Sequence, residues 1–146
     1  DDHLVAMLLT LAEAQTRVSI ETTGGRQVVG TIALVADDVI GVRTTTGDQV
    51  LVALAHTGAI VTHDDGLRPT GDRSATPGAS FAQILGALAE EGARVRVVTG
   101  AGGPGVIGTV VSCGRDVLTL RLEGTGRHAI VGHRAIADLT VEDRLF

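Results

Sequence analysis

Histidine and aspartate residues lie on or beside expected strands in both halves of the chain, where they could bind a metal ion. His128 and His133 are five residues apart on an expected strand and its following loop, with Asp138 further on, and His56 and His63 bracket an expected strand at 59–62. Zinc sites usually have tighter, repeated spacing, such as two ligands within one turn or one helical turn apart. We therefore expect surface or subunit-contact histidines and no metal site.

Other residues that could take part in catalysis are better explained by structural roles. The run Gly100–Gly105 is rich in glycine, but a phosphate-binding loop leads into a helix, and here a strand pattern follows. The single cysteine, Cys113, ends a strand-like run and is predicted to be a small buried hydrophobic residue. No serine lies in the strained turn of a nucleophile elbow. We expect that the protein is not an enzyme and has no cofactor.

The basic residues are arginines, because the chain contains no lysine. Residues 1–73 carry 5 arginines and 10 acids, and residues 74–146 carry 7 of each, so a polyanion would prefer the second half. The net charge is −5, and the chain has no tryptophan or tyrosine and two phenylalanines. Nucleic-acid binding draws on clustered cations and on stacking aromatics, so this composition favours solvated arginines over a nucleic-acid surface.

The composition indicates a folded, soluble protein. Of the 146 residues, 44% are hydrophobic and 20% are charged, which is enough apolar material for a packed core. No apolar run is long enough to cross a membrane, and no leader sequence is recognised, so we expect no membrane association. One unpaired cysteine fits a reducing cytoplasm, and the bias towards Arg, Ala, Gly, Val and Asp suggests a GC-rich bacterial genome.

The chain contains two copies of one unit. Leu8 aligns with Leu85 in the first segments of the copies. After one inserted residue in a glycine-rich turn, Gly30 aligns with Gly108, and we expect the rest of the copies to align with no further gap. The apolar positions of the two copies match almost throughout, which indicates that both fold in the same way.

Each copy opens with a predicted helix, because its apolar residues recur at helical spacing. Ser80 with Gln83 forms a capping-box signature before the second helix. The apolar positions of the two expected helices are Leu4, Met7, Leu8 and Leu11, and Phe81, Ile84, Leu85 and Leu88.

Five short strands are predicted to follow each helix. Arg94 to Val97 alternate polar and apolar residues, which places both arginines on one face and both valines on the other. The matching first strand begins at Arg17. The remaining strands are expected at 27–36, 38–44, 49–54 and 59–62, and at 106–113, 116–122, 127–132 and 136–141.

A helix followed by five turn-linked strands is typical of a small barrel. The fold class predicted is therefore mainly β with two short helices: two small barrels in tandem, each a helix followed by five strands. The predicted domains are residues 1–65, a linker over 66–79 that is rich in Pro, Gly and Ser, and residues 80–146. Whether the two barrels are independent or share one sheet stays open.

The two copies resemble the Sm and LSm family, which includes bacterial Hfq. The resemblance rests on the helix plus five strands and on Gly30-Thr31-Ile32 to Asp38-Val39-Ile40-Gly41-Val42, repeated as Gly108-Thr109-Val110 to Asp116-Val117-Leu118-Thr119-Leu120. It implies tandem Sm-like or SH3-like barrels, each an N-terminal helix followed by five strongly bent antiparallel strands. It also implies self-association through the fourth and fifth strands into rings, and oligonucleotide binding around the pore. By analogy with six-membered rings of the family, three chains would form one ring.

The chain departs from the family where RNA-binding members read a base. Their asparagine is replaced at Ile40-Gly41 and Leu118-Thr119, and their stacking residue between the second and third strands is absent. Arg134 and His133, with His56 as a weaker partner, remain candidates for phosphate or base contact. The full set of nucleic-acid candidates is Arg134, His133, His56, Arg127, His128 and Arg115.

The function expected from this reasoning is a non-catalytic assembly or interaction module. RNA is the ligand that the resemblance suggests, and the homo-oligomer would form through strand edges. The alternative is a purely structural or regulatory module of a larger protein, which binds a protein partner and has no nucleic-acid role.

Overall fold

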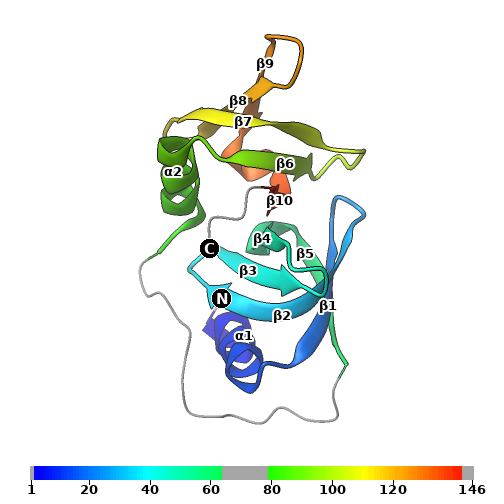
Figure 1. Cartoon of the computed structure of the whole chain (residues 1–146). Helices are drawn as coiled ribbons and strands as arrows, with labels where there is room; N and C mark the ends of the chain where they lie inside the picture. The colour runs from blue at the N-terminus through cyan, green and yellow to red at the C-terminus, as the bar shows by residue number, and fades with distance from the viewer. Residues whose placement is uncertain (1, 64–78, 143–146) are drawn as a thin grey trace.

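The computed structural model describes residues 2–63 and 79–142, which form two units of the same kind (Figure 1). Unit 1 comprises residues 2–63 and unit 2 comprises residues 79–142. The predicted linker, 66–79, lies outside the described residues except for Ala79. The elements of unit 1 are α1 (Asp2–Ala14), β1 (Arg17–Thr22), β2 (Gln27–Val35), β3 (Val39–Thr44), β4 (Gln49–Ala53), the 3-10 turn η1 (Leu54–His56) and β5 (Thr57–Thr62).

Unit 2 repeats this order, as the duplication predicts. Its elements are α2 (Phe81–Glu91), β6 (Arg94–Thr99), β7 (Val106–Cys113), β8 (Val117–Leu122), β9 (His128–Gly132), η2 (His133–Ala135) and β10 (Ile136–Val141). The capping box before α2 is confirmed: the Ser80 hydroxyl accepts from the Gln83 backbone N–H, and the Gln83 side chain accepts from the Ser80 N–H.

The alignment of the two copies needs one correction after the third strand. Val39 pairs with Ala53 in unit 1, and its counterpart Val117 pairs with Gly132 in unit 2. An alignment with no further gap would instead match Ala53 to Val131. The turn between β8 and β9 therefore holds one extra residue, and the prediction that no further gap follows is wrong. With this residue included, β9, η2 and β10 correspond to β4, η1 and β5.

In the part of the chain that the structure describes, ten strands form one antiparallel sheet, in the order β5-β1-β2-β3-β4-β10-β6-β7-β8-β9. The two units meet where β4 pairs with β10, with Leu51 opposite Leu139 and Val50 opposite Thr140. Within the described residues this sheet is not closed, and the expected tandem Sm-like or SH3-like barrels are not confirmed. The units share a sheet because β4 pairs on one side with β3 of its own unit and on the other side with β10 of unit 2.

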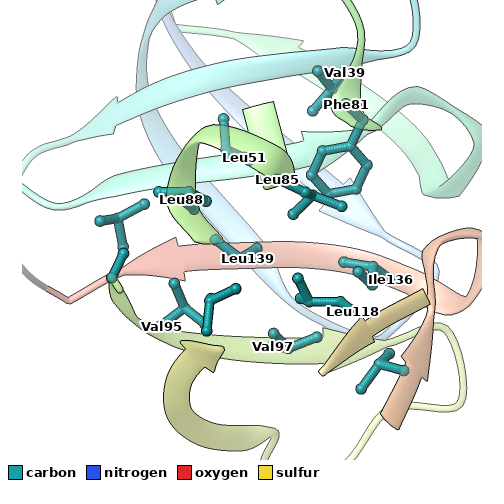
Figure 2. Close-up of a cluster of buried hydrophobic side chains, with 14 of the residues drawn as sticks. Val39, Leu51, Phe81, Leu85, Leu88, Val95, Val97, Leu118, Ile136 and Leu139 are labelled. Carbon is teal, nitrogen blue, oxygen red and sulfur yellow. The ribbon is translucent and has the colours of Figure 1, made fainter. Parts of the chain in front are cut away.

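The core crosses the boundary between the units. Figure 2 shows Phe81 and Leu85 of α2 lying between Val39 and Leu51 of unit 1 and Leu139 of unit 2. A second cluster, built on the buried face of α1 and the inner faces of β1 to β4, fills unit 1 alone. One buried cluster thus depends on residues from both units.

The start of α2 is held by the turn between β2 and β3. The Phe81 backbone N–H donates to Asp38 Oδ1 at 2.7 Å, and the Asp37 N–H donates to the Ala79 carbonyl at 3.0 Å. An acidic side chain at this place satisfies one of the orphan N–H groups of a helix start. The helix of unit 2 therefore docks on unit 1.

Two burial predictions differ from the structure. Met7, predicted on the buried face of α1, is 50% exposed. Cys113 is half-buried rather than buried, and burial raises the pKa of its thiol. The alternation in β6 is confirmed, since Val95 and Val97 are buried and both arginines of that strand are partly exposed.

Gly30 lies where β2 and β3 approach too closely for a side chain. A Cβ atom there would lie 2.1 Å from the Arg43 carbonyl oxygen. We predict that Gly30→Ala lowers the free energy of unfolding by about 3 kcal/mol, because the two strands must separate. Urea denaturation followed by far-UV circular dichroism measures this, since the chain has no Trp or Tyr for fluorescence.

Gly86→Ala is the matched control. Gly86 lies inside α2, and nothing lies within 4 Å of the position its Cβ would take. The free energy of unfolding should rise by about 0.5–1 kcal/mol, because alanine favours the helix. Equal effects of the two substitutions would contradict the close approach at Gly30.

Candidate functional site

A cavity of about 310 Å³ opens at the junction of the two units. Three of the predicted site residues, His56, His133 and Arg134, line it from η1 and η2. The start of α2 and the β2–β3 turn complete its wall with Phe81 and Asp38. The structure thus brings together residues that are far apart in the sequence, because the pairing of β4 with β10 places η1 next to η2.

His56 forms hydrogen bonds from both of its ring nitrogens. Its Nε2 lies 2.6 Å from the Arg134 carbonyl oxygen, and its Nδ1 lies 2.7 Å from the Thr23 hydroxyl. Because a carbonyl only accepts, Nε2 carries the hydrogen, and in the neutral ring Nδ1 accepts from the hydroxyl. His56 therefore links unit 1 to unit 2.

His133 and Arg134 differ in how far their side chains are engaged. His133 Nε2 lies 3.6 Å from the Cys113 sulfur, and its backbone N–H donates to the Asp116 carbonyl. Within residues 2–63 and 79–142, the Arg134 guanidinium has no hydrogen bond or ion pair and is exposed. Arg134 is the residue at this cavity with a free cationic group.

The other three nucleic-acid candidates are not gathered at the cavity. Arg115 lies in the turn between β7 and β8, beside the Asp116 carbonyl that holds His133. Arg127 and His128 lie at the opposite end of β9 from His133, separated by the length of that strand. The six candidates therefore do not form one basic surface.

An ion pair that the sequence does not predict lies at the same junction. Arg26 Nη1 lies 3.3 Å from Asp138 Oδ1, and the Asp138 side chain is fully buried. Burial raises the pKa of Asp138, and the charge of Arg26 opposes this shift. From the sequence, Asp138 is only a distant candidate for a metal ligand, because no local pattern marks an aspartate in an apolar strand as the partner of an arginine in unit 1.

The chemistry available to the described residues is limited. In the part of the chain that the structure describes, no three His, Cys, Asp or Glu side chains gather so that they could hold a metal ion. Neither α1, with 13 residues, nor α2, with 11, has the length and apolarity that a membrane-spanning helix needs. The cavity places the free guanidinium of Arg134 beside an apolar wall. This arrangement suits the binding of a ligand better than catalysis.

A second candidate site is the pair of unpaired sheet edges. Among residues 2–63 and 79–142, the outer strands β5 and β9 have a neighbouring strand on one side only. Val61 on β5 is 56% exposed and Ile130 on β9 is 73% exposed. Exposed apolar side chains on unpaired edges are unusual, because such edges template pairing with another chain.

No protein-family model matches this chain, and no curated protein matches it in sequence. The resemblance to the Sm family therefore rests on the motifs of the two copies.

The buried carboxylate of Asp138 gives a prediction on pH dependence. Its pKa is raised in the folded protein, so the folded state binds the proton more tightly than the unfolded state does. The carboxylate therefore lowers stability increasingly as the pH rises from the unfolded pKa, close to the ordinary value of 3.8, through the raised folded pKa. We predict that Asp138→Asn gains free energy of unfolding relative to the wild type as the pH rises through this window.

Urea denaturation of both proteins at a series of pH values measures the difference in their free energy of unfolding. The other carboxylates are the same in both proteins, so their contributions cancel in this difference. Arg26→Ala serves as the companion variant, because removing the cation should raise the pKa of Asp138 further and widen the window. A difference between Asp138→Asn and the wild type that shrinks with rising pH would mean that the carboxylate is stabilised by its site.

Proposed function

We propose that this protein is a non-catalytic self-assembly module, in which tandem Sm-like barrels of one chain join those of the next through the edge strands β9 and β5. The chain already contains one junction of this kind, between β4 and β10. The two outer strands of the sheet are the counterparts of these two strands. The β5 strand of a second copy would therefore pair with β9 of the first copy, as β10 pairs with β4 inside the chain.

The observation that carries the proposal is a difference in burial between equivalent positions. Leu51 on β4 is 7% exposed, and its equivalent on β9, Ile130, is 73% exposed. On the other side of the junction, Thr140 is buried, whereas its equivalent Val61 is 56% exposed. The residues that β4–β10 pairing covers inside the chain are thus uncovered at the two ends, and they are more apolar than edge residues usually are.

The internal register specifies the contact between chains. Leu139 lies opposite Leu51 inside the chain, and the equivalents of these two residues in the other unit are Ile60 and Ile130. Ile60 of one copy would therefore lie opposite Ile130 of the next. In the same register Val61 would lie opposite the residue before Ile130, an alanine. Directly opposed apolar side chains are the main stabilising pairs of an antiparallel ladder.

Such a contact is head-to-tail, because β9 and β5 are different surfaces. Head-to-tail contacts produce a closed ring when the rotation closes and a filament when it does not. The resemblance to six-membered Sm rings supports closure after three chains, each of which supplies two units. The assembly proposed is therefore a ring of three chains.

A second candidate function is the binding of single-stranded RNA at the junction cavity. It is supported by the free guanidinium of Arg134 next to His133 and His56. Asp38, which lines the same cavity, has one carboxylate oxygen engaged by the start of α2. The overall acidic charge and the lack of Tyr and Trp stand against tight binding.

A charged substitution at Ile130 tests the contact through the β9 edge. Light scattering coupled to gel filtration should give the wild type a mass of three chains of 14.9 kDa each. Ile130→Glu should weaken each contact by about 30-fold or more, because about 2 kcal/mol of apolar burial is lost and a charge is buried. The variant should then elute as a single chain at micromolar concentration.

Val111→Glu is the matched control, since Val111 is also an exposed apolar residue but lies on β7, away from both edges. It should assemble as the wild type does. A wild type that is a single chain at all concentrations would overturn the proposal and favour a module that binds a different protein through its edges.

Removal of the Arg134 side chain tests RNA binding at the junction cavity. Fluorescence anisotropy with labelled U-rich and A-rich oligonucleotides at low salt should show weaker binding by Arg134→Ala than by Arg43→Ala, an exposed arginine on β3 away from the cavity. We expect the loss at Arg134 to be about 10-fold, the scale of one charge-assisted contact. Equal losses would place the contact elsewhere, and no binding at low salt would remove RNA as a ligand.

A further inference from the structure

Helix α1 packs on unit 1 through one face and leaves an apolar side chain on another. Leu8 and Leu11 are buried in the core of unit 1, whereas Met7 is 50% exposed. Ala6, the preceding residue, is also exposed. Among the described residues Met7 is one of four large hydrophobic side chains with high exposure, and two of the others lie on the free edges β5 and β9.

The equivalent helix of unit 2 contacts both units. Leu85 and Leu88 of α2 lie in the buried cluster that also contains Leu51 of unit 1 (Figure 2). Ile84, on the next face of α2, packs against this cluster, as does Leu34 of unit 1. Ile84, Leu34 and Leu51 line one cleft of about 260 Å³. The junction inside the chain is therefore made by a strand pair and by a helix that lies across it.

The repeat assigns each of these residues a counterpart. Met7 corresponds to Ile84 in the alignment of the two helices, just as Leu8 corresponds to Leu85. On the strands, Ile130 corresponds to Leu51, because the pairing of β8 with β9 matches that of β3 with β4.

A third pair of counterparts completes the surface. Ser112 corresponds to Leu34, because both pair just after the bulge in the second strand of their unit, with Thr119 and with Gly41. Inside the chain, Ile84 and Leu51 line the same cleft. Their counterparts Met7 and Ile130 are both exposed.

We infer that in the assembly α1 of one copy lies across β9 of the next copy, with Met7 in contact with Ile130. This inference rests on the proposed function, because it adds a helix to the strand contact proposed there. The contact between copies is then a strand pair covered by a helix, and each chain supplies the helix and β5 at one end and β9 at the other.

The occupant of this surface is a second copy of the chain. Both halves of the contact are present on every copy, and the internal junction seats the same kind of helix over the same kind of strand. Methionine also suits the helix position, since its flexible thioether adapts to a surface formed by Ile130 and the smaller Ser112, where isoleucine meets two leucines inside the chain.

The test compares two neighbouring positions on α1. Met7→Glu should lower the association of copies by at least 10-fold in sedimentation velocity. Ala6→Glu is the matched control, because Ala6 corresponds to Gln83, which is exposed at the internal junction. It should assemble as the wild type does. Far-UV circular dichroism checks that both variants keep their secondary structure.

Cross-linking tests the same contact without disturbing it by a charge. In a Cys113→Ser background, the pair Met7→Cys and Ile130→Cys is treated with a short bis-maleimide and examined on a denaturing gel. Covalent dimers and trimers are expected, whereas the pair Ala6→Cys and Ile130→Cys should give few. Dilution before treatment should abolish the products, since they join separate chains.

The outcomes separate the helix contact from the edge contact. If the wild type assembles and Ile130→Glu disperses it, while Met7→Glu behaves like Ala6→Glu and the cysteine pairs cross-link equally, the helix contact is wrong and the edge contact stands. If Met7→Glu alone of the two helix variants weakens assembly and its cysteine pair cross-links, the helix contact is supported. A wild type that is a single chain overturns both.

Discussion

The antiparallel pairing of β4 with β10 is the interaction on which the rest of this structure depends. A strand with one free side has unpaired backbone groups, which either stay in water or pair with another strand. Here the fourth strand of unit 1 and the fifth strand of unit 2 satisfy each other over four residue pairs. The two units therefore form one continuous sheet, and the side chains on both strands are buried by this pairing.

Several features of the junction follow from this pairing. It places η1 beside η2, so His56 reaches the Arg134 carbonyl, and it brings α2 over β4, so Phe81 meets Asp38. It also buries Asp138 beside an arginine of unit 1. The equivalent of Asp138 in unit 1 is an alanine at position 59, so this ion pair belongs to the internal junction and has no counterpart on the β5 edge. The two kinds of edge therefore differ in their polar chemistry while sharing their apolar positions.

The ends of the sheet have the same constraint without the same solution. β5 and β9 are the copies of β10 and β4, and their outer side chains are exposed where those of the internal strands are covered. Each unit has a fourth-strand edge and a fifth-strand edge. Because the internal junction uses one edge of each kind, the chain retains one free edge of each kind. This physical arrangement is the basis of the proposals for assembly and for the helix contact.

The sequence by itself determined the local structure, because periodicity, capping and turn residues act over a few positions. The alternation from Arg94 to Val97, the capping box at Ser80 and the order of one helix and five strands in each copy were all predictable in this way. The choice of strand partners was not, since β4, β5, β9 and β10 have similar apolar patterns, and only the packing of the whole chain selects which edges meet. The cavity of His56, His133 and Arg134, the exposure of Met7 and the burial of Asp138 depend on that choice or on the packing that follows it. Backbone pairing joins residues that are far apart in the sequence, and no pattern within one strand specifies its partner.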